Sequence, residues 1–271
     1  MAFDPDTEVS GPRLSPLAIA SWSVAFGVSL LMLWVVGHYR LSAEFGMVSL
    51  GFVGLVIVLF LIDCNSRSAK RRTLALQQMA HRRGWHFLPD GHADVLSGIE
   101  RFELGARGGH AHQVSNLLSG TIDGVRFYVF DFGFMDGSGK GARYRRQSVV
   151  WLQRDDAKLP SFSVYPALFW WTRAHSLDNG RRKIDVPGPH WFTRQYDVRS
   201  CDEQAMLDLL TGDVLSFFNG PLTLAVEGTG THLMLCEKQA RLMKPEELVT
   251  FLEQSQRLLQ NLTDSASRGT E

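Results

Sequence analysis

The sequence has few cysteines, no net charge and no recognisable catalytic motif. Cys64, Cys201 and Cys236 have no short spacing, which argues against a disulfide framework or a thiolate zinc site and fits a reducing compartment. The chain holds 28 basic and 28 acidic residues, a balance that argues against a dedicated nucleic-acid binder. Neither the G-x-S-x-G nor the H-E-x-x-H motif is present, so no hydrolase or zinc-protease chemistry is indicated.

Charge is also missing from two long apolar runs near the N-terminus, residues 17–37 and 45–62. They contain 21 and 18 residues, and a helix needs about 20 apolar residues to cross a bilayer. Trp22, Trp34 and Tyr39 lie near their ends, where the aromatic residues of membrane spans gather. The runs therefore predict two transmembrane helices rather than a buried core hairpin. The residues before the first run are mainly acidic, which argues against a signal peptide.

Basic residues follow the second run closely. Six of them lie between Cys64 and Arg83, whereas the link between the two runs has only Arg40. Because Lys and Arg favour the cytoplasmic side of a membrane, we expect a multi-pass protein of the cell inner membrane, with its N- and C-termini in the cytoplasm. The lipid bilayer is then the expected partner. The sequence identifies no protein partner and indicates no nucleic acid.

The rest of the chain predicts short strands and a few helices. Residues 116–122 and 125–134 flank Asp123-Gly124, a combination typical of a β-hairpin with a type I′ turn. Short strands joined by short links favour antiparallel pairing. The predicted fold class is α+β: an N-terminal transmembrane helical hairpin followed by a soluble domain of mainly antiparallel strands with flanking helices. The other expected strands are 85–88, 147–152, 161–165, 194–199, 222–227 and 232–237, and the expected helices are 68–83 (continuing from the second run), 93–99, 203–210, 212–218 and 245–262.

These elements predict five consecutive regions. They are an N-terminal tail (1–15), a two-helix transmembrane anchor (16–63), a basic juxtamembrane helix (64–83), a soluble α+β domain (84–262) and a disordered tail (263–271). Gly84 is the expected stop of the juxtamembrane helix. The last nine residues are small and polar, which is the reason to expect disorder there.

Several motifs occur together between Gly84 and about Leu259. They include Arg-Gly-Trp at 83–85, Asn-Leu-Leu-Ser-Gly at 116–120, Phe-Asp-Phe-Gly-Phe at 130–134, Arg-Gln-Ser-Val-Val at 146–150, Leu-Pro-Ser-Phe-Ser-Val-Tyr-Pro at 159–166 and Phe-Thr-Arg-Gln-Tyr at 192–196. As a set they resemble a family of uncharacterised bacterial membrane-anchored proteins with two N-terminal transmembrane helices and a cytoplasmic α+β domain. The sequence departs from the family at Val186, where members tend to have Phe, and at Ala167, where they tend to have Glu. The resemblance implies a shared fold and an N-terminal anchor, and no reaction.

His110 and His112 form the best candidate for a metal site. Alternate residues of an extended chain point the same way, so both imidazoles would reach one ion. A site needs further ligands, and His81, His86 and His92 are near only in sequence. Two histidines without an identified third ligand are more often surface residues, so we predict neither a metal nor a cofactor.

A glycine-rich and basic segment spans residues 137–146. It is not a phosphate-binding loop, because Phe134 and Gly141 stand where that loop needs Gly and Ser or Thr. We expect a flexible hairpin loop. Its four basic residues are either simply solvated or contact an anionic membrane surface or a phosphorylated ligand. These residues are Lys140, Arg143, Arg145 and Arg146.

Two functions from different classes follow. The favoured one is a membrane-anchored cytoplasmic binding or scaffold module, because an anchor is predicted and a catalytic constellation is not. The alternative is a membrane-tethered enzyme, metal-dependent through His110 and His112, that acts on a lipid-derived or phosphorylated substrate. The sequence favours a protein that is not an enzyme, and it identifies no catalytic residue.

Overall fold

The chain divides into two compact units, Met1–Leu74 and Ala75–Glu271. The computed structural model describes residues 27, 43–103, 112–136, 141–167, 180–220, 223–237 and 244–268. The first predicted span, residues 17–37, therefore lies outside the described residues except for Gly27.

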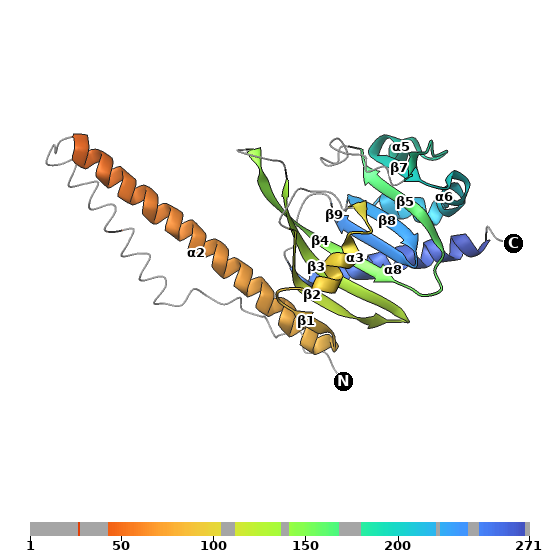
Figure 1. Cartoon of the computed structure of the whole chain (residues 1–271), viewed down its shortest axis with the longest axis horizontal. Coiled ribbons are helices and arrows are strands. Elements are labelled where there is room, and N and C mark those ends of the chain that lie inside the picture. Colours follow the sequence, from red (N-terminus) through yellow and green to blue (C-terminus); the bar gives the residue numbers. More distant parts are fainter. Residues whose placement is uncertain are drawn as a thin grey trace. The chain divides into compact units, whose positions relative to one another are not determined.

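Helix α2 (Ala43–Arg83) includes the backbone of the whole second uncharged run and continues without a break into the basic segment (Figure 1). The expected continuity of residues 68–83 with that run is thus observed. The helix ends at the predicted glycine, where Gly84 has φ +68° and Trp85 N–H donates to the Ala80 carbonyl at 2.9 Å, a typical glycine-terminated helix end. No helix within the described residues has the length and apolarity that crossing a membrane requires.

The second unit is built on one sheet, whose strands follow the order β1-β2-β3-β4-β9-β8-β5-β7-β6 among the described residues. Every neighbouring pair is antiparallel. The predicted α+β class, with mainly antiparallel strands and flanking helices, is confirmed for this unit. The strands are β1 (His86–Leu88), β2 (Gln113–Ile122), β3 (Val125–Asp136), β4 (Arg143–Gln153), β5 (Leu159–Pro166), β6 (Arg182–Lys183), β7 (Tyr196–Ser200), β8 (Leu224–Gly230) and β9 (His232–Glu237). The helices are α3 (Ala93–Ile99), α5 (His190–Gln195), α6 (Glu203–Leu209), α7 (Gly212–Phe218) and α8 (Pro245–Arg268).

The hairpin predicted at Asp123-Gly124 is present between β2 and β3. Asp123 has φ +50° and Gly124 has φ +78°, and Ile122 pairs with Val125, as a type I′ turn requires. Asn116 also has positive φ, +52°, and it lies where the β2 register shifts. Asparagine tolerates this left-handed conformation better than most residues.

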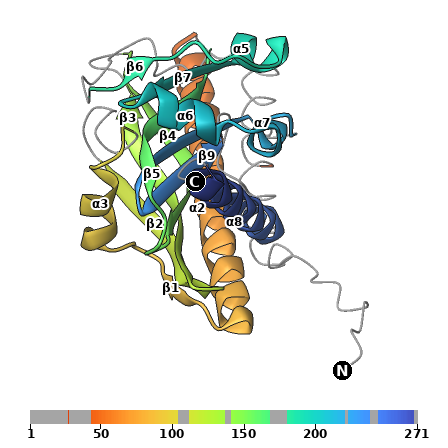
Figure 2. The ribbon, with the colours of Figure 1, turned by 90° about the vertical axis from the view of Figure 1, so that its right-hand side faces the viewer.

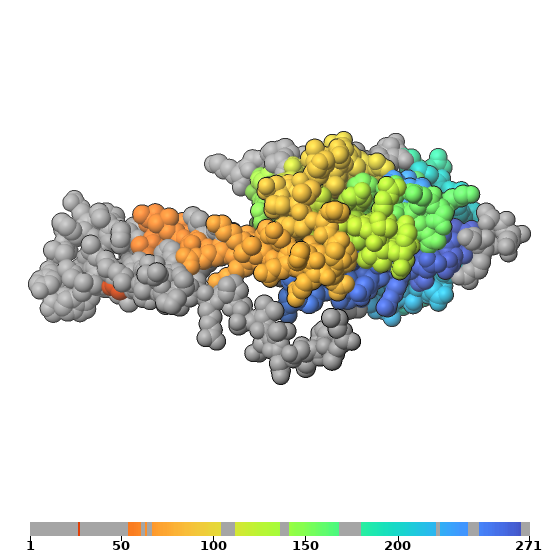
Figure 3. Space-filling view, turned by 90° about the horizontal axis from the view of Figure 1, so that it is seen from below, coloured from red at the N-terminus to blue at the C-terminus, as the bar shows by residue number. Residues whose placement is uncertain are grey.

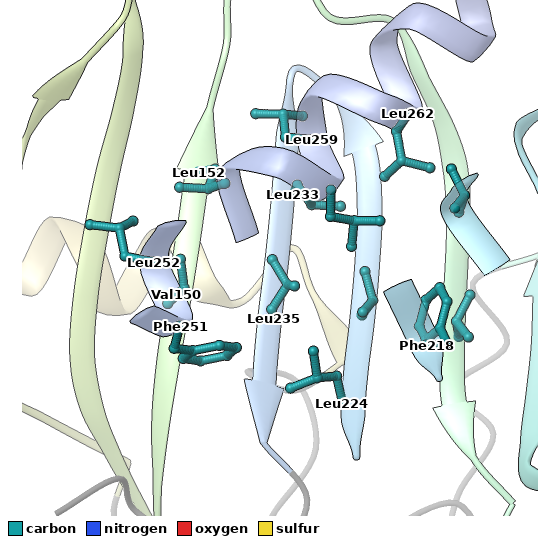
Figure 4. Close-up of a cluster of buried hydrophobic side chains, with 14 of the residues drawn as sticks. Val150, Leu152, Phe218, Leu224, Leu233, Leu235, Phe251, Leu252, Leu259 and Leu262 are labelled. Carbon is teal, nitrogen blue, oxygen red and sulfur yellow. The ribbon is translucent and has the colours of Figure 1, made fainter. Parts of the chain in front are cut away.

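The main core fills one face of the sheet. Helices α6, α7 and α8 lie on this face, together with Leu76, Met79 and Ala80 from the end of α2. The last helix, expected at 245–262, carries apolar residues at helical spacing, and these side chains are all buried: Leu248, Phe251, Leu252, Leu258 and Leu259. Figure 4 shows Phe251, Leu252 and Leu259 over side chains of β4 and β9.

A second core fills the opposite face. Val95 and Ile99 of α3 pack there with Phe102 and with apolar side chains of β2, β3, β4 and β9. Figures 2 and 3 show α3 (yellow) and α8 (blue) on opposite sides of the strands. Because both faces are covered, the central strands carry buried residues on both sides rather than a simple alternation.

Strand β4 begins earlier than predicted. Residues 143–146 are part of the predicted flexible loop, but Arg143 pairs with Asp136 and the ladder continues without interruption to Gln153. The predicted loop was wrong for these residues because hydrogen bonds to β3 hold them in a strand despite their charge. Residues 137–140 lie outside the described residues.

Other boundaries also differ. Residues 194–195 belong to α5 instead of a strand, since Pro189 favours a helix start immediately after it. Strand β8 continues through the predicted turn to Gly230, because Gly228 and Thr229 pair with β9. Leu222, expected in that strand, is outside the described part of the chain.

The last helix extends beyond its predicted end at Leu262. Helix α8 reaches Arg268, so the prediction of a disordered tail was wrong for residues 263–268. Ser265 is buried and its Oγ lies 3.3 Å from Thr211 Oγ1, while Thr263 Oγ1 donates to the Leu259 carbonyl at 2.8 Å. These contacts with α7's N-terminal cap residue and with the helix itself order a segment whose composition is polar.

Candidate functional site

Four polar side chains meet inside the second unit and form what we call the buried ionic cluster: Glu103, Tyr165, Arg181 and Glu227. Glu103 follows α3, Tyr165 lies on β5, Arg181 immediately precedes β6 and Glu227 lies on β8. The side chain of Arg181 is 3 % exposed and those of both glutamates are 2 % exposed. Charges are rarely buried to this extent unless they are paired.

Glu227 is the centre of this cluster. Its Oε2 accepts hydrogen bonds from Glu103 N–H at 2.8 Å and from Arg181 Nη1 at 3.1 Å. Its Oε1 accepts from the Tyr165 hydroxyl at 2.5 Å. Arg181 Nη1 also lies 3.6 Å from Glu103 Oε1. One arginine thus bridges two carboxylates, and each partner comes from a different part of the chain.

The groups around Glu227 are held in their protonated forms. Burial, followed by the charge of Glu227, raises the pKa of the Tyr165 hydroxyl well above its ordinary value. The pKa of the nearby Cys236 thiol is also raised well above its ordinary value, by burial and then by Glu227. A thiol must ionise to act as a nucleophile, so Cys236 behaves as a small buried apolar residue.

The cluster fixes the chain at two places. Glu103 follows α3 and Arg181 precedes β6, and both are bonded to Glu227 on the sheet. Arg181 Nε adds a hydrogen bond to Ser161 Oγ at 3.1 Å. Because Glu227 accepts from donors of the protein itself, the arrangement secures these segments to the sheet.

A second polar group lies around His232 at the start of β9. Arg101 Nη1 is 2.7 Å from His232 Nε2, and Trp151 Nε1–H donates to His232 Nδ1 at 3.3 Å. The Arg101 guanidinium also lies 5.7 Å from the Trp151 ring centre, and Tyr128 stacks on Trp151 at 4.9 Å. A neutral imidazole accepts at one nitrogen and an imidazolium at neither, so this arrangement favours the neutral ring.

Acid should therefore weaken the fold through His232. Burial, then the charges of Arg101 and Arg126, lower the pKa of His232 below 6.5. The unfolded chain then binds the proton more readily, so stability falls as pH drops through 6.5 toward the lower folded-state pKa. We measure the free energy of unfolding by urea titration at about pH 7.5 and at about pH 5. Between these two pH values it should fall more for the parent protein than for His232→Gln. Equal losses in the two proteins would contradict the effect.

The histidine pair predicted as a metal candidate is only partly described. His110 lies outside the described residues. His112 immediately precedes β2, and its ring centre lies 5.4 Å from that of Phe132. Among the described residues, no group of three or more His, Cys, Asp or Glu side chains is arranged to hold a metal ion. The candidate pair therefore stays a prediction without a third ligand.

The four basic residues of the other candidate site have different surroundings. Lys140 is outside the described residues, whereas Arg143, Arg145 and Arg146 lie on β4. Arg143 and Arg146 are exposed and Arg145 is half-buried. The Arg146 guanidinium lies 5.2 Å from the ring centre of Tyr144. The structure thus places three of the four residues on one strand.

Two groups of aromatic residues flank β6 in the sequence. Phe169, Trp170 and Trp171 are outside the described residues. Phe192 is completely buried and stacks on Tyr196 at 5.2 Å, so it belongs to the core. Trp191 packs against the core from a half-buried position.

A small hollow lies beside β7. Its volume is about 150 Å³, and its lining includes Lys183, Asp185, Thr193 and Tyr196. Lys183 Nζ is held by Asp197 Oδ1 at 2.6 Å. Pockets for drug-sized ligands occupy roughly 300–1,000 Å³, so this hollow is too small for one.

Sequence reasoning missed Glu103, Arg181 and Glu227. One signal was present: Glu227 is the single charged residue of β8 and follows the apolar residues Leu224, Ala225 and Val226. A lone acid in a strand that is otherwise apolar indicates a buried partner. The partners themselves, Arg181 and Glu103, lie 46 and 124 positions away in the sequence.

Comparisons with known proteins give little further guidance. No family model matches the chain, and no curated protein does. Among solved structures, the chain is similar to the crystal structure of the mycobacterial trehalose monomycolate transport factor A, TtfA, with 12 % identity and a TM-score of 0.49. The similarity covers 72 % of this chain and 93 % of that chain. At this score the likeness carries no argument about ligand or activity.

Proposed function

We propose that this protein is a membrane-anchored binding module of the cytoplasmic face of a cell inner membrane. In this proposal residues 17–37 and 45–62 form a transmembrane hairpin, both termini are cytoplasmic, and the sheet domain binds a partner. The family of membrane-anchored proteins that the sequence resembles has the same organisation, and the proposal includes membership of that family.

The observation that carries the anchor is an exposed apolar stretch of α2. Leu55, Ile57, Val58, Leu59 and Phe60 have exposed fractions between 37 and 54 %. Residues 57–60 are consecutive, and successive residues of a helix are about 100° apart, so apolar side chains surround the whole helix. A helix that is apolar all round belongs in a protein core or a membrane.

Energetics support the membrane as the environment of this stretch. Removing one large apolar side chain from water contributes about 1.5–3 kcal/mol, and these five are among the eight large hydrophobic residues exposed in the described structure. Arg67, Lys70, Arg71 and Arg72 follow within the same helix. Their charge supports an orientation with the following domain on the cytoplasmic side.

Binding is favoured over catalysis by the chemistry of the described polar groups. The buried carboxylate of Glu227 is bonded to Arg181, Tyr165 and a backbone N–H. Tyr165 and Cys236 are uncharged at neutral pH, since their ordinary pKa values already lie above it and burial raises both pKa values further. The hollow beside β7 has a volume of about 150 Å³, below the roughly 300–1,000 Å³ of pockets for drug-sized ligands, and the proposal assigns recognition to the surface of the domain.

Reporter fusions to the full-length protein test this topology. A phosphatase that is active only outside the cytoplasm should be silent after Glu271 and active when inserted after Ser42. Green fluorescent protein at the same positions should give the opposite pattern. Replacing Arg67, Lys70, Arg71 and Arg72 with Gln should produce mixed orientation. Phosphatase activity at the C-terminus, or recovery of the intact protein without membranes, would refute the proposed anchor.

A further inference from the structure

The β3–β4 pair extends beyond the strands on either side of it. We call residues 133–136 and 143–146 the hairpin end. Strand β9 pairs with β4 only from Val149 onward, and the last pair that β2 makes with β3 is Gln113–Gly133. Past these points the described residues form a two-stranded ribbon, with Phe134 opposite Arg145 and Met135 opposite Tyr144 (Figure 1).

Basic side chains occupy both faces of this ribbon. Side chains alternate along a strand, so Arg143 and Arg145 lie on one face and Tyr144 and Arg146 on the other. Tyr144 is 44 % exposed, and its hydroxyl donates to Gln113 Oε1 at 3.2 Å. The Arg146 guanidinium lies beside the Tyr144 ring, 5.2 Å from its centre. An aromatic ring is therefore displayed among the cationic groups.

The charge of the hairpin end is positive. Its three arginines are accompanied by one acid, Asp136. Among the described residues, Arg143 and Arg146 form no ion pair with a carboxylate. Because the backbone is already ordered by the β3 ladder, binding costs less conformational entropy than it would from a flexible loop.

We propose that the hairpin end binds the anionic headgroups of the membrane surface. Guanidinium groups form paired hydrogen bonds with phosphate oxygens, and tyrosine is enriched at the level of lipid headgroups because its ring is apolar and its hydroxyl polar. A ribbon with cations on both faces suits an end-on approach, in which both faces meet headgroups together. This inference rests on the proposed function, since the anchor supplies the surface.

Amide hydrogen exchange of the full-length protein in nanodiscs tests the inference. One set of discs contains phosphatidylcholine alone, and the other also contains phosphatidylglycerol. The attraction of each basic residue to an anionic surface changes the ratio of surface-bound to unbound protein by about fivefold. We therefore expect exchange at residues 133–136 and 143–146 to slow by at least about fivefold in the anionic discs, and to return to the neutral-disc rate in high salt.

The double substitution Arg143→Gln/Arg146→Gln should abolish this slowing. It spares the half-buried Arg145, so the thermal midpoint should stay at the parent value. Arg182→Gln/Arg194→Gln removes the same charge from exposed positions elsewhere and should retain the slowing.

Three results would overturn the inference. The first is an equal rate of exchange in the two kinds of disc. The second is that Arg182→Gln/Arg194→Gln loses the slowing as completely as Arg143→Gln/Arg146→Gln does. The third is that inorganic phosphate, added to neutral discs, slows exchange as much as the anionic discs do. Failure of the protein to remain with either disc would instead refute the anchor. Vesicles of the same two compositions, added to that protein, would then test the hairpin end by itself.

Discussion

Replacing Arg181 with Met is expected to destabilise the sheet domain by about 3–5 kcal/mol. The substitution keeps an unbranched apolar side chain of similar length but removes the charge that bridges Glu103 and Glu227. Two carboxylates that are 2 % exposed would then lie close together without that cation. Urea unfolding of the full-length protein in detergent, followed by tryptophan fluorescence, measures the loss.

Two companion variants identify the cause. Arg182→Met changes the exposed neighbour and should alter stability by less than about 0.5 kcal/mol. The double variant Arg181→Met/Glu227→Gln should be more stable than Arg181→Met alone, because it leaves one buried carboxylate, Glu103, without the cation instead of two. An Arg181→Met protein that unfolds like its parent would show that the ionic cluster contributes nothing to stability.

Phe251→Ala is expected to cost a similar amount, about 3–5 kcal/mol, through the main core. Phe251 is completely buried on α8, and it packs with residues of the sheet on the face opposite α3 (Figure 4). Truncation removes its apolar contacts and leaves a cavity that neighbouring strands cannot close, because they are paired on both sides. The same urea titration measures this loss.

Glu253→Ala is the matched control for the second substitution. Glu253 lies two residues further along α8 and is exposed, so its loss should change stability by less than about 0.5 kcal/mol. If both variants unfold at the parent's urea concentration, α8 does not contribute to the cooperative unit. If both are equally destabilised, the effect belongs to the helix itself and not to the core.

Much of the local structure could be predicted because its causes lie within a few residues. The Asp123-Gly124 turn needs two residues that tolerate positive φ, and both are adjacent in the chain. Asp202 directly precedes the predicted helix 203–210, and its Oδ1 accepts from Ala205 N–H at 3.0 Å, as the residue that caps a helix does. The periodicity of α8 likewise identified its buried side chains. In each case the deciding contact is local.

The boundaries at Arg143 and Ser265 were misplaced because contacts with another strand or another helix decide them. Arg143 is in a strand because it pairs with Asp136 across the hairpin. Ser265 is in a helix whose end packs beside Thr211. Charged and small polar residues have little intrinsic preference for these states, so composition predicted loop and tail instead.

The sequence alone determined the two uncharged runs and the basic segment after them, since these depend only on the order of residues. It also determined the antiparallel strand character of the domain, because alternation and turn residues are local properties. The tertiary structure decided the strand order, the meeting of Glu103, Arg181 and Glu227, and the exposure of Tyr144 beside Arg146. The reason is physical: burial and ion pairing depend on distances in space, and residues as far apart as 103 and 227 have no local signal that brings them together.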